Sequence, residues 1–178
     1  PSFQIVPLQG GDIFILGLAG SGKSNLLRTL ATSLAFTHTP EQLHIYALDY
    51  GGQSRLKILE TFPHLGAVVT RLEKERTERL VSYLSNEILR RNTLMRKAKV
   101  DSWIDYNIQA KPGEKFPAIF LIIDGFINLK DAFEPEMIKK IVMLVGGQSA
   151  GIHLAISSYT QSDLPNELLS NINSRISL

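Results

Sequence analysis

The chain has 178 residues, of which 44% are hydrophobic and 20% charged, with a formal net charge of +2 and no cysteine. This length suits one domain with a substantial core, and the charge is too small to indicate nucleic-acid binding by itself. The absence of cysteine excludes disulfides, thiol nucleophiles and cysteine-ligated metals, and no apolar run approaches the roughly 20 residues that span a bilayer.

Short apolar runs alternate with longer amphipathic stretches along the chain, a pattern typical of strands and helices arranged around a parallel sheet. In chain order, we predict a strand over 12–17, a helix over 24–36, strands over 44–49 and 67–70, a helix over 72–99, a strand over 118–124, a helix over 135–145 and a strand over 151–159. The most apolar strand, 118–124, is predicted to be central. The fold class is therefore α/β, with three α-β-α layers, a mostly parallel sheet and helices on both faces.

The stretch GLAGSGKS (17–24) matches the phosphate-loop pattern G-x-x-x-x-G-K-[ST] between a predicted strand and a predicted helix. Glycines let the backbone N–H groups turn inward, and the helix N-terminus adds a partial positive charge. We expect Lys23 to reach the β- and γ-phosphates and Ser24 to bind Mg²⁺, with ATP and Mg²⁺ as cofactors. The alternative is a glycine-rich turn that binds nothing. The predicted nucleotide-binding residues are Gly17, Leu18, Ala19, Gly20, Ser21, Gly22, Lys23, Ser24 and Asn25.

Asp124 ends the longest apolar run, which is how a buried strand delivers a carboxylate to a site at its tip. In P-loop proteins such an aspartate lies near the Mg²⁺, so Asp124 is assigned as the second metal residue beside Ser24. Asp49 also ends a strand but is the weaker claimant. The alternative for Asp124 is a strand-terminal residue that only caps a turn.

With these motifs in place, the chain resembles the FtsK/SpoIIIE group of RecA-like P-loop ATPases, and specifically an ATPase module of the EccC/EssC proteins of type VII (ESX) secretion. The resemblance covers nearly the whole chain and is carried by PEQLHIYALDYGG (40–52), FPHLGAVVTRLEKERTERL (62–80), NEILRRNTLM (86–95), VDSWIDYN (100–107), FLIIDGF (120–126), SAGIHLAISS (149–158) and NINSRISL (171–178). The IDGF stretch is similar to the second of several tandem modules, with the third as the neighbouring possibility.

The resemblance implies that residues 1–178 are one module excised from a longer, membrane-anchored chain and lying on the cytoplasmic side of the membrane. A start at Pro1 rather than methionine favours the same interpretation. The implied partners are neighbouring ATPase modules, other subunits of the secretion machine and secreted WXG100-type proteins. A hexamer of the full protein stays open, direct membrane insertion by this domain is not expected, and DNA binding is expected to be weak or absent.

Gly125 departs from the family pattern, in which a glutamate after the metal-site aspartate orients the attacking water. Positioned proton transfer contributes typically about 10²–10⁴-fold to rate, so its loss would slow hydrolysis without removing affinity. We therefore assign no catalytic residue beyond Asp124 as the second-motif acid. The site is expected to hold ATP well and hydrolyse it poorly.

The last predicted strand ends in SSYTQ, where Ser158, Thr160 or Gln161 could sense the γ-phosphate, with Gln161 as the candidate. Ordinary strand-end polar residues are the equal alternative. Arg175 matches a basic position of the family. A structural ion pair is favoured for it over an arginine finger that reaches a neighbour's nucleotide.

Two further groups admit two interpretations each. The basic residues at 90, 91, 96, 97 and 99 could contact nucleic acid or an acidic partner, although a solvated helix face is favoured. Trp103 and Tyr106 could lie in a loop beside the nucleotide or against a neighbouring module, or could be aromatics tucked into the fold.

Three functions compete on these observations. The first is an ATP-binding module that regulates or scaffolds protein export with weak or no hydrolysis. The second is an active motor for protein export or DNA translocation, which needs a water-activating acid that IDGF does not supply. The third is a scaffold that no longer uses nucleotide, against which the intact GLAGSGKS stretch argues.

Overall fold

A computed structural model of the chain describes residues 8, 11–52, 54–172 and 174–178, so that Pro1 lies outside the described part. Within these residues the sheet has six strands in the order β3-β2-β4-β5-β1-β6, and every pairing between them is parallel. The strands are β1 (Ile13–Leu16), β2 (Leu43–Asp49), β3 (Leu65–Thr70), β4 (Ala118–Asp124), β5 (Ile152–Ser158) and β6 (Ser174–Ser177). The predicted central position of residues 118–124 is confirmed, because β4 lies between β2 and β5 and is buried along its whole length.

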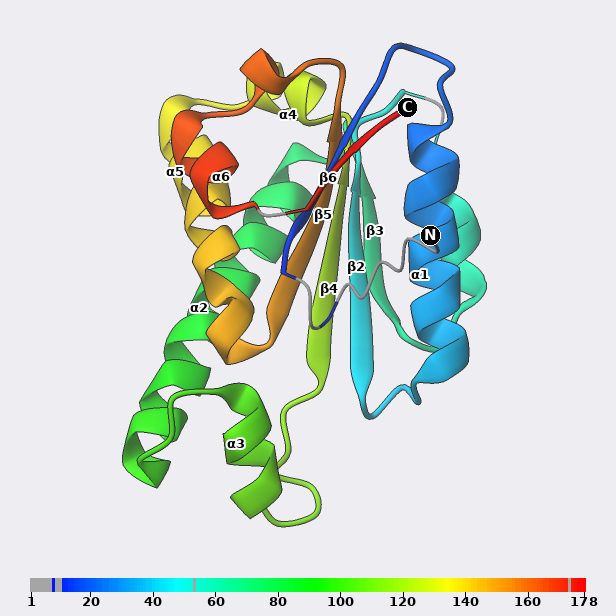
Figure 1. Cartoon of the computed structure of the whole chain (residues 1–178). Helices are drawn as coiled ribbons and strands as arrows, with labels where there is room; N and C mark the ends of the chain where they lie inside the picture. Colours follow the sequence, from blue (N-terminus) through cyan, green and yellow to red (C-terminus); the bar gives the residue numbers. More distant parts are fainter. Residues whose placement is uncertain (1–7, 9–10, 53, 173) are drawn as a thin grey trace.

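Helices cover both faces of the sheet, which confirms the predicted three-layer α/β fold (Figure 1). One face packs against α1 and the short helix η1, and the other packs against α2, α5 and the shorter helices α4 and α6. The α-helices are α1 (Lys23–Thr37), α2 (Lys74–Ala98), α3 (Trp103–Gln109), α4 (Phe126–Ala132), α5 (Pro135–Leu144) and α6 (Asn166–Asn171). The 3₁₀ helices are η1 (Lys57–Thr61), η2 (Val145–Ala150) and η3 (Gln161–Asp163). Among the described residues, no helix combines the length and the apolar character that a membrane crossing requires.

Parallel strands place their carboxyl ends at one edge of the sheet, where ligands bind in open α/β folds. At this edge the loop from β1 to α1 meets the ends of β4, β5 and β2. The alternation of side chains puts Ile122 of β4 and Ala155 of β5 in the core cluster under α1. Two residues further along each strand, Asp124 and Ser157 therefore face the same layer as α1.

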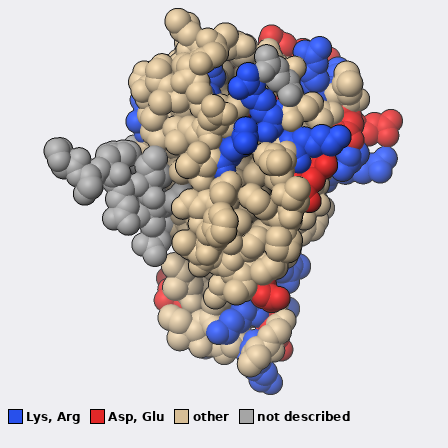
Figure 2. Space-filling view, turned by 90° about the vertical axis from the view of Figure 1, so that its right-hand side faces the viewer, with Lys and Arg blue, Asp and Glu red and all other residues tan. Residues whose placement is uncertain are grey.

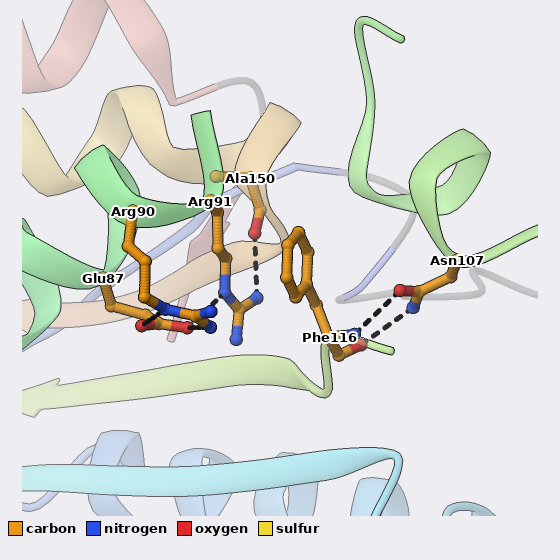
Figure 3. A network of polar contacts seen from close by, with 6 residues as sticks. All are labelled: Glu87, Arg90, Arg91, Asn107, Phe116 and Ala150. Atoms are coloured by element: carbon orange, nitrogen blue, oxygen red, sulfur yellow. Dashed lines mark hydrogen bonds and ion pairs between the residues drawn. The ribbon is translucent and has the colours of Figure 1, made fainter. Parts of the chain in front are cut away.

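The opposite edge of the sheet carries α3 and a polar network at the end of α2 (Figure 3). Arg91 is only 1% exposed, and its guanidinium donates hydrogen bonds to Glu87 and to the carbonyl of Ala150. Arg90 pairs with the same carboxylate. Arg90 and Arg91 of the predicted basic group are thus bound to this network, and Arg91 offers no surface for nucleic acid.

The aromatic residues of α3 are tucked into this end of the molecule. The ring of Tyr106 stacks on Phe116 with centroids 4.2 Å apart, and Trp103 lies edge-on to His153 at 6.5 Å. In Figure 1, α3 lies far from the loop between β1 and α1. The interpretation that placed Trp103 and Tyr106 beside the nucleotide is therefore wrong, since the hydrophobic cluster with Phe116 holds them at the other end of the molecule. A contact with a neighbouring module stays a prediction.

Two buried titratable groups give the stability of this fold opposing pH dependences. Burial raises the pKa of Asp12 from 3.8 to about 6, while its Oδ1 accepts a hydrogen bond from the Leu154 amide at 2.7 Å. Burial and the nearby Arg91 charge lower the pKa of His153 from 6.5 to about 4. The folded state therefore holds its Asp12 proton more tightly than the unfolded state, and its His153 proton less tightly.

We expect Asp12→Asn and His153→Phe to change the pH dependence of stability in opposite directions. Between about pH 4 and 6, the contribution of Asp12 to the free energy of unfolding falls as pH rises, whereas that of His153 increases. Removing Asp12 therefore leaves only the increasing contribution of His153. The free energy of unfolding of Asp12→Asn should then climb more steeply with pH than that of the wild type, and that of His153→Phe should fall. Urea unfolding at pH 4.5 and 6.5 measures both, and identical slopes in the three proteins would refute the assignment.

Candidate functional site

The loop between β1 and α1 is shaped by its glycines. Gly22 caps α1 with a φ of 101°, a left-handed conformation that favours glycine. A Cβ on Gly17 would lie 2.4 Å from the Ser21 hydroxyl and 2.8 Å from the Leu178 carbonyl, so that position also excludes a side chain. The loop thereby leads directly into the first turn of α1, whose backbone N–H groups and partial positive charge favour an anion.

Ser24 and Asp124, which are a hundred residues apart in sequence, are in direct contact. The Ser24 hydroxyl donates to Asp124 Oδ2 at 2.6 Å, and the Ser157 hydroxyl donates to Asp124 Oδ1 at 2.5 Å. Ser157 in turn accepts from the Gly125 amide at 2.9 Å. Both carboxylate oxygens of the buried Asp124 are thus oriented by hydroxyl groups, with one oxygen turned toward the start of α1.

Lys23 is the first residue of α1, and its ammonium is turned back on the backbone of the preceding loop. It donates to the carbonyls of Gly17 and Leu18 at 2.7 and 2.9 Å, and lies 5.0 Å from the ring centroid of Tyr159. Burial lowers the pKa of Lys23, while the Coulombic attraction of Asp124 opposes this shift. The group is a cation within reach of the cavity that Asp124 also lines.

A cavity of about 170 Å³ lies between these groups. Of the predicted phosphate-loop residues, Ala19, Gly20, Gly22, Lys23, Ser24 and Asn25 line it, whereas Gly17, Leu18 and Ser21 do not. The remaining lining residues come from the loop after β2 and the ends of β4 and β5: Gly51, Arg55, Asp124, Gly125, Ser158 and Tyr159. The structure therefore brings most of the predicted site residues to one hollow at the carboxyl edge of the sheet.

Gly125 has a structural reason to be glycine. Its φ is 76°, and a Cβ there would lie 2.8 Å from the Tyr50 carbonyl oxygen and 2.9 Å from the Gly51 nitrogen. The loop after β2 thus passes directly against position 125, where it leaves no room for a side chain. Asp49, the weaker claimant, is 3% exposed and does not line the cavity; its Oδ2 accepts from the Leu56 amide at 2.9 Å.

The loop after β5 is fixed by Asp163. Its carboxylate accepts hydrogen bonds from the hydroxyls of Ser158 and Thr160 and from the amides of Tyr159 and Thr160. Gln161 begins η3, is exposed and does not line the cavity. Of the three candidate sensors, only Ser158 reaches the cavity wall, and its hydroxyl is bound to Asp163.

Arg175 lies on the edge strand β6, away from this cavity. Its Nη2 donates to the carbonyl of Leu169 at 2.8 Å, so the contact is structural, although the partner is a backbone oxygen rather than a carboxylate. The favoured structural role is thus present without the predicted ion pair, and no contact among the described residues tests the alternative of an arginine finger that reaches a neighbour's nucleotide.

Sequence reasoning missed Ser157, Tyr159 and Arg55. Successive side chains of a strand point to opposite faces of the sheet, and Ser157 lies two residues after Ala155 on β5. The direction of the Ser157 side chain toward Asp124 could therefore have been predicted once the face of Ala155 was known. The loop that carries Tyr159 is held by nearby Asp163, and the loop that carries Arg55 is held at its start by the distant Asp124 and Asn128. No sequence motif marks either residue.

A model of the FtsK/SpoIIIE family matches residues 2–178 of the chain. The ESX-4 secretion system protein EccC4 of Mycobacterium tuberculosis is 33% identical over 170 residues, which cover 94% of this chain and 14% of that protein. The solved structure of Thermomonospora curvata EccC (ATPases 2 and 3) in complex with a signal sequence peptide is 31% identical with a TM-score of 0.87, covering 96% of this chain and 32% of that one. EssC (ATPases 2 and 3) from Geobacillus thermodenitrificans is 28% identical with the same TM-score and the same coverage.

Proposed function

The chain belongs to the FtsK/SpoIIIE family, its relatives are EccC and EssC proteins of type VII secretion, and we propose that it holds Mg-ATP with weak or no hydrolysis. It spans only 11–14% of several EccC and related chains, so the role of a longer parent is part of the proposal. In that parent, residues 1–178 would be one ATPase module on the cytoplasmic side of the membrane.

The contact between Ser24 and Asp124 carries the proposal. A hydroxyl and a carboxylate oxygen 2.6 Å apart are oxygen ligands of the kind that Mg²⁺ prefers. Among the described residues, no cluster of three or more His, Cys, Asp or Glu could enclose a metal. Phosphate and water oxygens would therefore complete the coordination, as Mg²⁺ sites in nucleotide-binding proteins require. The donor set fits a metal that arrives with its nucleotide.

Weak hydrolysis is proposed because, among the described residues that line the cavity, no side chain is placed to activate water. Its only described acidic residue is Asp124, and both oxygens of Asp124 accept hydrogen bonds from Ser24 and Ser157. Gly125 offers no side chain at the place where the family's motors carry glutamate. When bound, Mg²⁺ supplies neutralisation of phosphate charge, while the chain itself binds and orients the nucleotide.

A nucleotide held without turnover would stabilise the module and its contacts. Ligand at 100 times its Kd stabilises the bound form by about 2.7 kcal/mol, enough to secure an interface between neighbouring modules. Such an interface would connect nucleotide occupancy with the binding of other secretion subunits or secreted proteins. The alternative, an active motor, requires an acid from outside this cavity.

Lys23→Ala tests the proposed site. Loss of a charged hydrogen-bond donor costs about 1.5–3 kcal/mol, so Mg-ATP affinity should fall about 10–100-fold by calorimetry. At nucleotide concentrations that saturate the wild type, the wild-type protein should hydrolyse ATP no faster than Lys23→Ala does.

Lys139→Ala, on the exposed face of α5, is the matched control and should bind Mg-ATP as the wild type does. A wild type that binds no nucleotide would reject the proposed function. Turnover in the wild type that disappears in Lys23→Ala would favour the motor.

A further inference from the structure

We propose that Arg55, on the loop after β2, recognises the terminal phosphate of ATP and makes the site select ATP over ADP; this rests on the proposed nucleotide function. Arg55 lines the same cavity as Lys23, Ser24 and Asp124. No sequence motif marks it, and the phosphate loop accounts for neither its position nor its charge.

The loop that carries Arg55 is anchored at both ends. Tyr50 donates its amide to the Asp124 carbonyl at 2.9 Å, and its own carbonyl accepts from the Asn128 side chain at 2.8 Å. Beyond Arg55, the Leu56 amide donates to buried Asp49, and Leu56 itself is fully buried. Residue 55 is thus held against the cavity by the residue that follows it and by the loop's start.

The strand order places Arg55 at the far end of the phosphate chain. The phosphate loop follows β1, Asp124 ends β4 two strands away, and the loop after β2 lies one strand further. Backbone N–H groups of a phosphate loop hold the inner phosphates, and its Lys and Ser act at the outer ones and the metal. A side chain that enters from beyond Asp124 therefore meets the terminal phosphate.

Charge favours the same assignment. The described lining residues include two cations, Lys23 and Arg55, and one acid, Asp124, which two hydroxyls orient for the metal side. Figure 2 shows Lys and Arg atoms, interspersed with Asp and Glu atoms, in the upper half of the face that carries α1, toward the end of the molecule where the site lies. Arginine stays charged and presents a planar fork of donors that matches phosphate oxygens.

The position of Arg55 is also consistent with a site that binds ATP but hydrolyses it poorly. Arg55 and Gly125 line the same cavity, so its lining offers a donor in Arg55 and no side chain at residue 125. A guanidinium stabilises a bound terminal phosphate but cannot accept a proton from water. ATP would be held through a contact that ADP cannot make.

The test compares Kd values for Mg-ATP and Mg-ADP in wild type, Arg55→Ala and Arg55→Lys by calorimetry. Because hydrogen bonds to charged groups are each worth about 1.5–3 kcal/mol, Arg55→Ala should weaken ATP binding about 10–100-fold. ADP affinity should change less than about threefold. Arg55→Lys, which keeps the charge without the fork, should lie between them.

Arg28→Ala is the matched control, because Arg28 lies on α1 and lines the neighbouring groove rather than the nucleotide cavity. It should bind both nucleotides as the wild type does. Equal losses for ATP and ADP in Arg55→Ala, or no loss for either, would overturn the inference while leaving the Lys23 result intact. A wild type that binds neither nucleotide would reject the proposed function and the inference together.

Discussion

Gly125→Glu should destabilise the fold by about 2–5 kcal/mol and should leave ATP turnover no faster than in the wild type. The left-handed backbone at this position, with φ of 76°, is unfavourable for any residue with a Cβ. The added Cβ would also lie within 2.9 Å of Tyr50 and Gly51 backbone atoms, which cannot rotate away as a side-chain tip can. Urea unfolding and a turnover assay on the same preparation measure the two effects.

Three alanine variants separate the causes. Gly125→Ala should lose most of the same stability, because the conformational and steric costs arise at Cβ. Gly52→Ala shares a positive φ of 94° but meets no atom within 4 Å, so it reports the conformational cost alone. Gly146→Ala has neither feature and should behave as the wild type. A Gly125→Glu protein that is as stable as the wild type and hydrolyses ATP faster would show that the packing at residue 125 does not require glycine.

The absence of an acid at residue 125 follows from the course of the loop after β2. The Tyr50 amide bonds to the Asp124 carbonyl, and a Cβ on Gly51 would lie 2.6 Å from Asp124 Oδ2. Close approach on both sides therefore requires glycine at 51 and at 125. The loop that occupies the place of the acid also brings Arg55 to the cavity.

The long elements could be predicted from sequence because their signals are strong. The prediction for β4 agrees with the structure at both ends, 118–124, since a continuous apolar run is bounded by Pro117 and Gly125. The predicted helix over 72–99 is α2, which begins two residues later. Its start follows Glu73, which accepts hydrogen bonds from the amide and hydroxyl of Thr70, and it ends where Lys99 turns left-handed.

The short elements could not be predicted in the same way. Helices α3, α4 and α6 have six or seven residues each, too few for two turns of apolar periodicity to appear. Strand β6 has four residues and forms only by pairing with β1. Their existence depends on tertiary packing, which a local reading of the sequence does not contain.

The residues of the candidate site likewise fall into two groups, those marked by a local sequence pattern and those placed by the tertiary structure. A contiguous motif and a strand-terminal acid predicted the meeting of Ser24 with Asp124, and the structure brings these residues together at 2.6 Å. Ser157 and Arg55 belong to the site through strand register and loop course. Conversely, Arg91 appeared in sequence as one of several exposed basic residues, although α2 turns it into the core.

Glu87→Gln should be the most destabilising conservative change at the other end of the molecule, with a loss of about 3–5 kcal/mol. Glu87 lies between Arg90 and Arg91, and its Oε1 accepts from Arg91 Nε at 2.7 Å (Figure 3). The Arg91 guanidinium also lies 5.0 Å from the Phe116 ring and is almost fully buried. Neutralising Glu87 leaves that buried charge without a counterion, which is the costly way to break a buried pair.

Arg91→Met should cost less, because it removes the buried charge itself while Glu87 keeps its two hydrogen bonds with Arg90. The double variant Glu87→Gln/Arg91→Met should therefore recover stability relative to Glu87→Gln alone, and a double-mutant cycle in urea gives the coupling energy. Glu75→Gln removes an exposed pair with Arg79, where the glutamate side chain is 85% exposed, and should change stability by less than about 1 kcal/mol. If Glu87→Gln matched that control, Arg91 would be solvated in solution and the basic group on α2 would again be available to an acidic partner.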